Sequence, residues 1–299
     1  MKLGLGTVQF GTDYGVSNVG GKVSREKIAE ILALADSTEI DFLDTAPGYG
    51  DSEKVLGENG VTGRRFRIVT KTPGLRNAGG RDIEVAVRDS VLKSLAQLGC
   101  KKIYGILIHH ADDLIGPYGT SILEALTTVK NCGVVEKIGV SVYDSGQIDE
   151  VLKRKWVPDI IQLPINVLDQ RLVKNGYLKK LKNLGVEIHA RSLFLQGLLL
   201  MDADRIPDYF RNESGHFVDY AKFLADKQLS RIEAALGFIK QQQEIDVAIV
   251  GVTDPEELTE IVAAWRSQKA LTLDMSRFGL SDEAIINPSK WRFSRCLKR

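Results

Sequence analysis

Eight short apolar runs alternate with longer amphipathic segments along most of this chain, and this alternation limits the possible folds more than any other feature. Nearly continuous apolar content in short runs is typical of parallel strands covered on both faces. Between the runs, Ser24 precedes one helix-like segment, and Asp82 precedes another that ends at Gly99. The expected strands are 3–7, 41–45, 67–70, 103–109, 137–141, 160–163, 187–191 and 247–251.

Eight strand and helix units within 299 residues fit a closed barrel better than an open sheet. No linker or low-complexity segment interrupts the pattern. The sequence therefore predicts an α/β fold, a (β/α)8 TIM barrel that forms one domain over residues 1–299. Its active-site loops are expected at the carboxyl ends of the strands.

Four polar residues follow strand-like runs in the first third of the chain: Asp44, Tyr49, Lys71 and His109. A tyrosine phenol has an ordinary pKa of about 10, and a nearby lysine ammonium would lower it by roughly 1 to 3 units. An aspartate would keep that ammonium charged, and a histidine could orient a carbonyl. The set suits donation of a proton to a carbonyl oxygen as hydride reaches its carbon, a general-acid role worth about 100- to 10,000-fold.

Each of these residues also has an ordinary structural interpretation. Asp44 could cap a loop, Tyr49 could be a turn aromatic, and Lys71 could be a solvated strand end. A metal site at His109 and its neighbours is a further alternative. We expect no metal there, because no additional histidine or cysteine cluster completes a usual ligand set.

Five strings resemble, in order and spacing, the signatures of the aldo-keto reductases: GLGTVQFG, DTAPGYGDSE, VTK, LIHH and KIGVS. The resemblance runs from Leu3 to Trp265. It implies an NAD(P)H-dependent oxidoreductase that reduces an aldehyde or ketone, with Tyr49 as general acid. By the same resemblance, Asp44 and Lys71 tune the tyrosine. His109, rather than His110, would orient the carbonyl because it directly follows the apolar pair.

The resemblance also implies a site for the dinucleotide cofactor, although the amino-terminal GLG lacks the full glycine fingerprint of two-domain dehydrogenases. Ser141 and Gln162 would meet the nicotinamide amide, and the adenosine would lie over the segment after the last strand. Ordinary strand-end polarity is the alternative for Ser141 and Gln162. The expected cofactor-binding residues are Gly6, Thr7, Ser141, Gln162, Arg191, Gly251, Thr253, Glu257 and Glu260.

Two departures from the family pattern bear on the cofactor. Gly251 and Glu257 align where NADPH-dependent members have a lysine and an arginine, so we expect NADH to be favoured over NADPH. An exposed, merely solvated Glu257 is the alternative. Arg191 aligns where many members have an aromatic that stacks on the nicotinamide, and a cation there would favour the uncharged reduced ring. Alternatively, Arg191 points outward and pairs with an acid.

Two segments bear on the substrate. Residues 193–217 are expected to form a loop over the mouth of the active site. Residues 274–299 form a basic tail, which is either a solvated end or a clamp for an anionic substrate such as a sugar phosphate or nucleotide-linked sugar. The strings FLQGLLLM and QLPINVLDQRL resemble a bacterial branch associated with surface polysaccharides, so a small, sugar-like carbonyl substrate is expected.

Bulk composition supplies little about partners. The net charge of +1 argues against nucleic acid or membrane binding, and no long apolar stretch or export signal is visible. The three cysteines are odd in number and form no close-spaced pair, which favours the cytoplasm. No particular oligomeric state is predicted. Two other functions remain open: a regulatory, non-catalytic relative that binds the nucleotide, and a barrel hydrolase or isomerase without nicotinamide.

Overall fold

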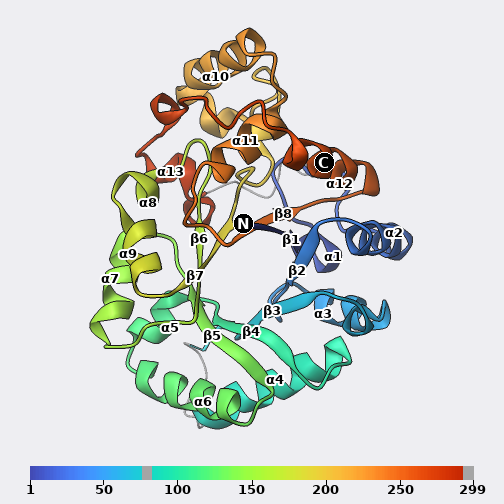
Figure 1. Ribbon diagram of the computed structural model, residues 1–299, viewed down its shortest axis with the longest axis vertical. Helices are drawn as coiled ribbons and strands as arrows, with labels where there is room; N and C mark the ends of the chain where they lie inside the picture. The colour runs from blue at the N-terminus through green and yellow to red at the C-terminus, as the bar shows by residue number, and fades with distance from the viewer. Residues whose placement is uncertain (76–82, 292–299) are drawn as a thin grey trace.

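The computed structural model describes residues 1–75 and 83–291. Eight parallel strands close into a barrel in chain order, because β1 pairs with both β2 and β8 (Figure 1). The prediction of a (β/α)8 barrel is therefore confirmed, and each expected strand differs from the observed one by at most two residues at either end. The strands are β1 (Lys2–Gly6), β2 (Ile40–Asp44), β3 (Arg67–Lys71), β4 (Ile103–Ile108), β5 (Val135–Ser141), β6 (Ile160–Pro164), β7 (Glu187–Arg191) and β8 (Val247–Gly251).

Helices surround the barrel, with α4 beside α3 and α6, and α12 beside α2 and α11 (Figure 1). The α-helices are α1 (Val8–Gly11), α2 (Arg25–Asp36), α3 (Ser52–Glu58), α4 (Ile83–Leu98), α5 (Ala111–Ile115), α6 (Gly119–Asn131), α7 (Ser145–Lys153), α8 (Arg171–Lys174), α9 (Tyr177–Asn183), α10 (Ser214–Asp226), α11 (Arg231–Lys240), α12 (Pro255–Arg266) and α13 (Glu283–Ile286). The 3-10 helices are η1 (Val61–Gly63), η2 (Leu198–Leu200), η3 (Asp208–Glu213), η4 (Ser276–Phe278) and η5 (Pro288–Lys290).

The sequence signals for the start of α2 and for the end of α4 are confirmed. The Ser24 side chain accepts a hydrogen bond from the Lys27 N–H and caps α2. After α4, Gly99 has a φ of +69°, a left-handed conformation that glycine adopts without steric cost at a helix end. The predicted start at Asp82 lies outside the described residues.

The barrel has a packed interior. Large apolar residues from five strands meet there, in a cluster distinct from the main core between strands and helices. Gly105 leaves room for this packing, because a Cβ at that position would lie 2.9 Å from Ile160 Cδ1. Filled layers of this kind make the barrel a rigid support for the loops at its ends. The cluster contains Phe42, Val69, Leu107, Ile160, Val247 and Ile249.

The expected loop at 193–217 is only partly irregular. It contains η2 and η3, and α10 already begins at Ser214. The sequence pattern missed these turns because short 3-10 helices carry no long hydrophobic period. Within the described ranges, no helix is both long and apolar enough to cross a membrane.

Candidate active site

A cavity of about 1070 Å³ lies where the strands end, and all thirteen residues predicted to act in catalysis or cofactor binding line it. They come from segments as distant in sequence as Gly6 and Glu260. Placement in one cavity agrees with the predicted roles but does not itself assign them. The thirteen are Gly6, Thr7, Asp44, Tyr49, Lys71, His109, Ser141, Gln162, Arg191, Gly251, Thr253, Glu257 and Glu260.

A buried ion pair lies beside the tyrosine. Lys71 Nζ donates to both carboxylate oxygens of Asp44 at 2.8 Å and to the Thr45 carbonyl oxygen at 3.0 Å. Gln162 Nε2 donates to Asp44 Oδ1 at 2.7 Å. The ammonium nitrogen is 4.8 Å from the centroid of the Tyr49 ring. Because the Lys71 side chain is only 1% exposed, the carboxylate and the phenol are its main charge-stabilising neighbours.

Burial and neighbouring charges act in opposite directions on the pKa values of Lys71 and Tyr49. Burial alone would lower the pKa of Lys71, but Asp44 and Tyr49 outweigh it and hold that pKa above its ordinary value. Burial raises the pKa of Tyr49, while the Lys71 ammonium opposes the rise. The expectation of a net lowering of the Tyr49 pKa is therefore wrong. The lysine acts in the expected direction, but desolvation of the phenolate is the larger effect.

His109 is held as a neutral imidazole. Burial, followed by the positive charge of Lys71, lowers its pKa to about 2. Its ring meets the Tyr49 ring edge to face, with centroids 5.8 Å apart. His110 stacks on His109 at 4.6 Å and is exposed. The N–H of a neutral imidazole beside the phenol can donate one hydrogen bond to a substrate carbonyl oxygen.

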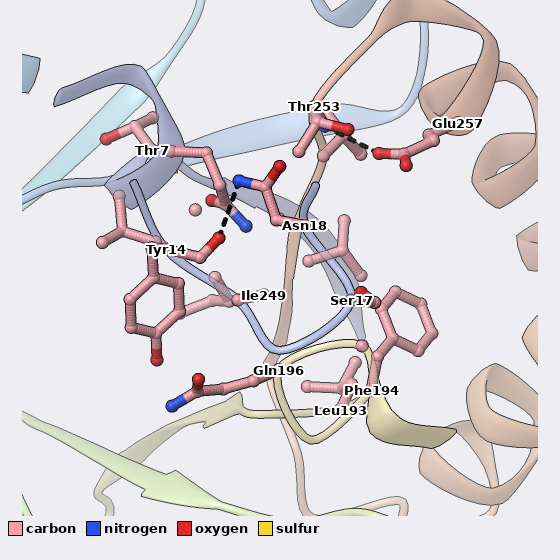
Figure 2. Close-up of a pocket in the computed structure, with 18 of the residues that line it drawn as sticks. Thr7, Tyr14, Ser17, Asn18, Leu193, Phe194, Gln196, Ile249, Thr253 and Glu257 are labelled. Atoms are coloured by element: carbon pink, nitrogen blue, oxygen red, sulfur yellow. Dashed lines mark hydrogen bonds between the residues drawn. The ribbon is translucent and has the colours of Figure 1, made fainter. Parts of the chain in front are cut away.

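The far end of the cavity lies at the amino terminus of α12. The Asp254 side chain accepts from the Glu257 N–H at 2.9 Å. The Glu257 carboxylate accepts in turn from the Thr253 N–H at 2.7 Å, as Figure 2 shows. Both carboxylates thus accept hydrogen bonds from backbone N–H groups that could otherwise bind an anion. This end of the cavity is consequently acidic, with Glu260 also lining it.

Two loops close one side of the cavity. Residues 12–23, which no sequence prediction placed at the site, meet residues 192–200, most of which belong to the loop expected over the mouth; there the Val16 N–H donates to the Gln196 carbonyl at 3.0 Å. Tyr14, Asn18 and Gln196 line the cavity (Figure 2). The glycine-rich string DYGVSNVGG was the available signal, since its Asn18 side chain bonds the turn's own backbone, including the Gly21 carbonyl at 2.8 Å.

Arg191 lies against an aromatic ring inside the cavity. Its guanidinium carbon is 4.3 Å from the centroid of the Tyr143 ring, and Nη2 donates to the Val142 carbonyl at 3.0 Å. The alternative in which Arg191 points outward to an acid is therefore wrong. Its cation lines the same cavity as Tyr49.

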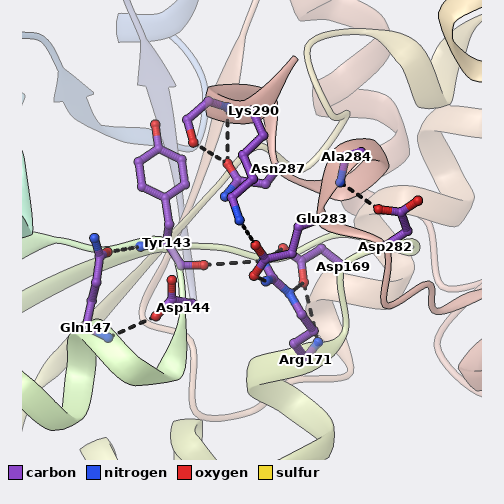
Figure 3. A network of polar contacts seen from close by, with 11 residues as sticks. Tyr143, Asp144, Gln147, Asp169, Arg171, Asp282, Glu283, Ala284, Asn287 and Lys290 are labelled. Carbon is purple, nitrogen blue, oxygen red and sulfur yellow. Dashed lines mark hydrogen bonds and ion pairs between the residues drawn. The ribbon is translucent and has the colours of Figure 1, made fainter. Parts of the chain in front are cut away.

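The backbone next to Tyr143 is tied to the carboxyl-terminal segment (Figure 3). Arg171 Nη2 donates to the Tyr143 carbonyl at 3.4 Å, and the same side chain pairs with Asp169 and Glu283 at 2.8 Å. Glu283 also pairs with Lys290. This network fixes α13 beside the loop that carries Tyr143.

The described part of the basic tail lies outside the cavity lining. Trp291 Nε1 donates to the Ile285 carbonyl at 3.0 Å, and its ring meets that of Phe210. Residues 292–299, which carry most of the predicted anion clamp, lie outside the described residues. The tail up to Trp291 therefore packs on the protein's own surface, and the clamp interpretation gains no support from it.

Comparisons agree with the class of enzyme that this barrel and cavity define. The model of the aldo/keto reductase family matches residues 2–282. The chain belongs to that family, and it is an oxidoreductase of the aldo-keto reductase type. Members of this family use NAD(P)H and act on small-molecule carbonyl substrates.

Three similar proteins illustrate the relationship. The NADH-specific methylglyoxal reductase of Escherichia coli (strain K12) is 28% identical over 297 residues, covering 88% of this chain and 89% of that protein. An aldo-keto reductase from Bacillus halodurans in its holo form has a TM-score of 0.72 at 20% identity, covering 97% of this chain and 95% of that one. The glycerol dehydrogenase of Gluconobacter oxydans has a TM-score of 0.67 at 21% identity, with coverage of 94% and 88%. The two solved structures resemble this chain in fold.

Proposed function

We propose that this protein reduces a small, sugar-like aldehyde or ketone to an alcohol with NADH, using Tyr49 as the general acid. One observation carries the proposal. The Lys71 ammonium, held by Asp44 at 2.8 Å, lies 4.8 Å from the Tyr49 ring centroid at the base of a cavity of about 1070 Å³.

The catalytic roles follow from charge and burial. The Tyr49 hydroxyl carries its proton at neutral pH and hands it to the carbonyl oxygen. The Lys71 ammonium stabilises the phenolate that remains, and Asp44 holds this ammonium in place. His109, being neutral, positions the carbonyl oxygen by one hydrogen bond without adding a charge.

The residues fit a nicotinamide. Gln162 Oε1 is buried and, among the described residues, has no hydrogen-bond partner, so it can accept from the carboxamide N–H. The Ser141 hydroxyl lines the same wall. When bound, the reduced nicotinamide supplies the hydride that reaches the carbonyl carbon. The further contacts that we propose for the cofactor are those of Gly6, Thr7, Gly251, Thr253 and Glu260.

Two features support NADH over NADPH. The Glu257 carboxylate occupies the start of α12, where a 2′-phosphate would meet repulsion and a ribose hydroxyl a hydrogen-bond acceptor. The E. coli relative is NADH-specific by name. The Arg191 cation adds a preference for the uncharged reduced ring over the oxidised one.

The substrate end favours small polar molecules. Tyr14, Tyr143 and Gln196 offer hydroxyl and amide groups in the same cavity as Tyr49, and Arg191 adds a positive charge. Such a surface suits a short hydroxylated carbonyl compound, including an anionic one. The relative's name, methylglyoxal reductase, also indicates a short carbonyl substrate for that protein. The cytoplasm stays a prediction.

A fluorescence titration with NADH and NADPH tests the proposal, using the wild-type protein and Tyr49→Phe. Tighter binding of NADH by both proteins is expected, with turnover of short aldehydes and sugar ketones lost only in the variant. Nucleotide binding without turnover by either protein would favour the regulatory alternative. Binding of neither nucleotide would reject a reductase and leave the hydrolase or isomerase alternative.

A further inference from the structure

We propose that Ser52 and Glu53, the first two residues of α3, are positioning residues that hold the turn carrying Tyr49 against the strands carrying Asp44 and Lys71. The inference rests on the proposed general-acid role of Tyr49. Both side chains are buried, and neither is among the described residues that line the cavity. They would therefore act through the tyrosine rather than on the substrate.

The turn that carries Tyr49 has little freedom. The Tyr49 N–H donates to the Ala46 carbonyl at 3.0 Å, and the Ser52 N–H donates to the Tyr49 carbonyl at 3.1 Å. Gly11 packs against it so closely that a Cβ there would lie 1.7 Å from the Tyr49 carbonyl oxygen. A shift at Ser52 is consequently transmitted to Tyr49.

The Ser52 hydroxyl joins the ends of two strands behind the cavity. It lies 2.9 Å from the Thr7 carbonyl oxygen, 2.8 Å from Thr7 Oγ1 and 3.1 Å from Thr45 Oγ1. Thr7 Oγ1 in turn donates to the Asp44 carbonyl at 2.9 Å. Thr45 is the link to the ion pair, because its carbonyl accepts from Lys71 at 3.0 Å. One buried serine is thus linked to Asp44 through Thr7 and to Lys71 through Thr45.

Glu53 ties the same helix to the third strand. Its Oε1 accepts from Thr70 Oγ1 at 2.6 Å, and Thr70 directly precedes Lys71 in β3. Successive strand residues point to opposite faces, so Lys71 lines the cavity while Thr70 meets α3 on the outside. Glu53 therefore holds the helix that follows Tyr49 at a set distance from the strand that carries its ammonium partner.

These contacts matter because proton transfer depends on position. A displacement of about 1 Å in a catalytic group can lower the rate by about 100-fold. Neither Ser52 nor Glu53 lines the cavity, but Ser52 bonds Thr7, which does. Loss of either residue should therefore lower kcat by a larger factor than it weakens NADH binding or raises KM. A residue needed only for folding would instead lower the fraction of protein that binds NADH and leave kcat per binding site unchanged.

The first test is Ser52→Ala, with kcat expressed per NADH-binding site. We expect a fall of roughly 10- to 100-fold, larger than any rise in the NADH dissociation constant or KM, because Thr7 keeps its hydrogen bond to the Asp44 carbonyl. Ser90→Ala is the matched control, because the Ser90 hydroxyl donates at 2.7 Å to a backbone carbonyl within α4, away from the cavity lining. An unchanged kcat per site in Ser52→Ala would overturn the role of Ser52.

The second test compares Glu53→Gln with Glu53→Ala. It still tests whether the start of α3 positions Tyr49 if Ser52→Ala does not fold. The glutamine keeps an oxygen that accepts from Thr70, so its kcat should stay near wild type, whereas the alanine should lose kcat at unchanged NADH affinity. Equal kcat in the two variants would overturn the role of Glu53. Full activity of Tyr49→Phe would instead refute the proposed function, whatever these variants do.

Discussion

Lys71 Nζ lies 2.8 Å from both carboxylate oxygens of Asp44, and this bidentate pair is buried beneath Tyr49. Within such a site a charge is tolerated only with its partner present. Stability and the proposed catalysis consequently depend on the same two side chains.

Removing one partner of this pair should destabilise the protein strongly. Asp44→Asn or Lys71→Met alone is expected to lower the free energy of unfolding by about 3 kcal/mol, because each leaves an uncompensated buried group. The double variant should recover part of that loss. Urea unfolding of all four proteins measures the coupling, and strictly additive losses would show that the pair is not coupled.

Replacing the carboxylate of Glu257 should weaken the preference for NADH. Glu257→Gln keeps an acceptor for the Thr253 N–H and removes the charge, so NADPH binding should improve relative to NADH by about fivefold, or about 1 kcal/mol. Parallel titrations with both nucleotides measure the ratio. Glu256→Gln, an exposed neighbour on the same helix, is the control and should leave the ratio unchanged.

Replacing Arg191 should alter the balance between oxidised and reduced cofactor. In Arg191→Met, NAD⁺ binding should tighten relative to NADH by about fivefold, because a fixed cation no longer faces the charged ring. Arg191→Lys keeps the charge but loses the planar contact with Tyr143. If the methionine variant left the NADH to NAD⁺ affinity ratio unchanged, the electrostatic role of Arg191 would be rejected.

The neutral state of His109 should produce a pH dependence of stability. Its folded-state pKa is about 2, below the value of about 6.5 in an unfolded chain, so unfolding takes up a proton below pH 6.5. Its stabilising contribution is complete above pH 6.5 and is lost progressively as the pH falls.

Unfolding measured between pH 6.5 and 5 should therefore show a steeper loss for wild type than for His109→Gln. This pH window lies above the range in which Glu187 affects stability. Despite its burial, hydrogen bonds from His189 and Lys137 lower the pKa of Glu187 to about 2. Its contribution to stability is therefore lost only below about pH 4.5. Parallel pH profiles for the two proteins would contradict the buried, neutral state of His109.

Local sequence patterns were sufficient for the barrel and for the polar residues at its strand ends, and the family resemblance supplied the expected cofactor-binding residues. Strand propensity and alternation are properties of short segments, and parallel strands bring their carboxyl ends to one face whatever their separation in sequence. That is why Asp44, Lys71 and His109 could be assigned to one site. The 3-10 turns within 193–217 were missed because they have no such repeat.

The sequence by itself determined the eightfold alternation, the family resemblance and the polar residues at the strand ends. Only the tertiary structure decided how they interact. It showed that Gln162 bonds Asp44 across 118 positions, that burial raises the pKa of Tyr49, and that the loop at 12–23 meets the loop at 192–200. Burial and long-range hydrogen bonds exist only once distant segments have packed together, so no local pattern can encode them.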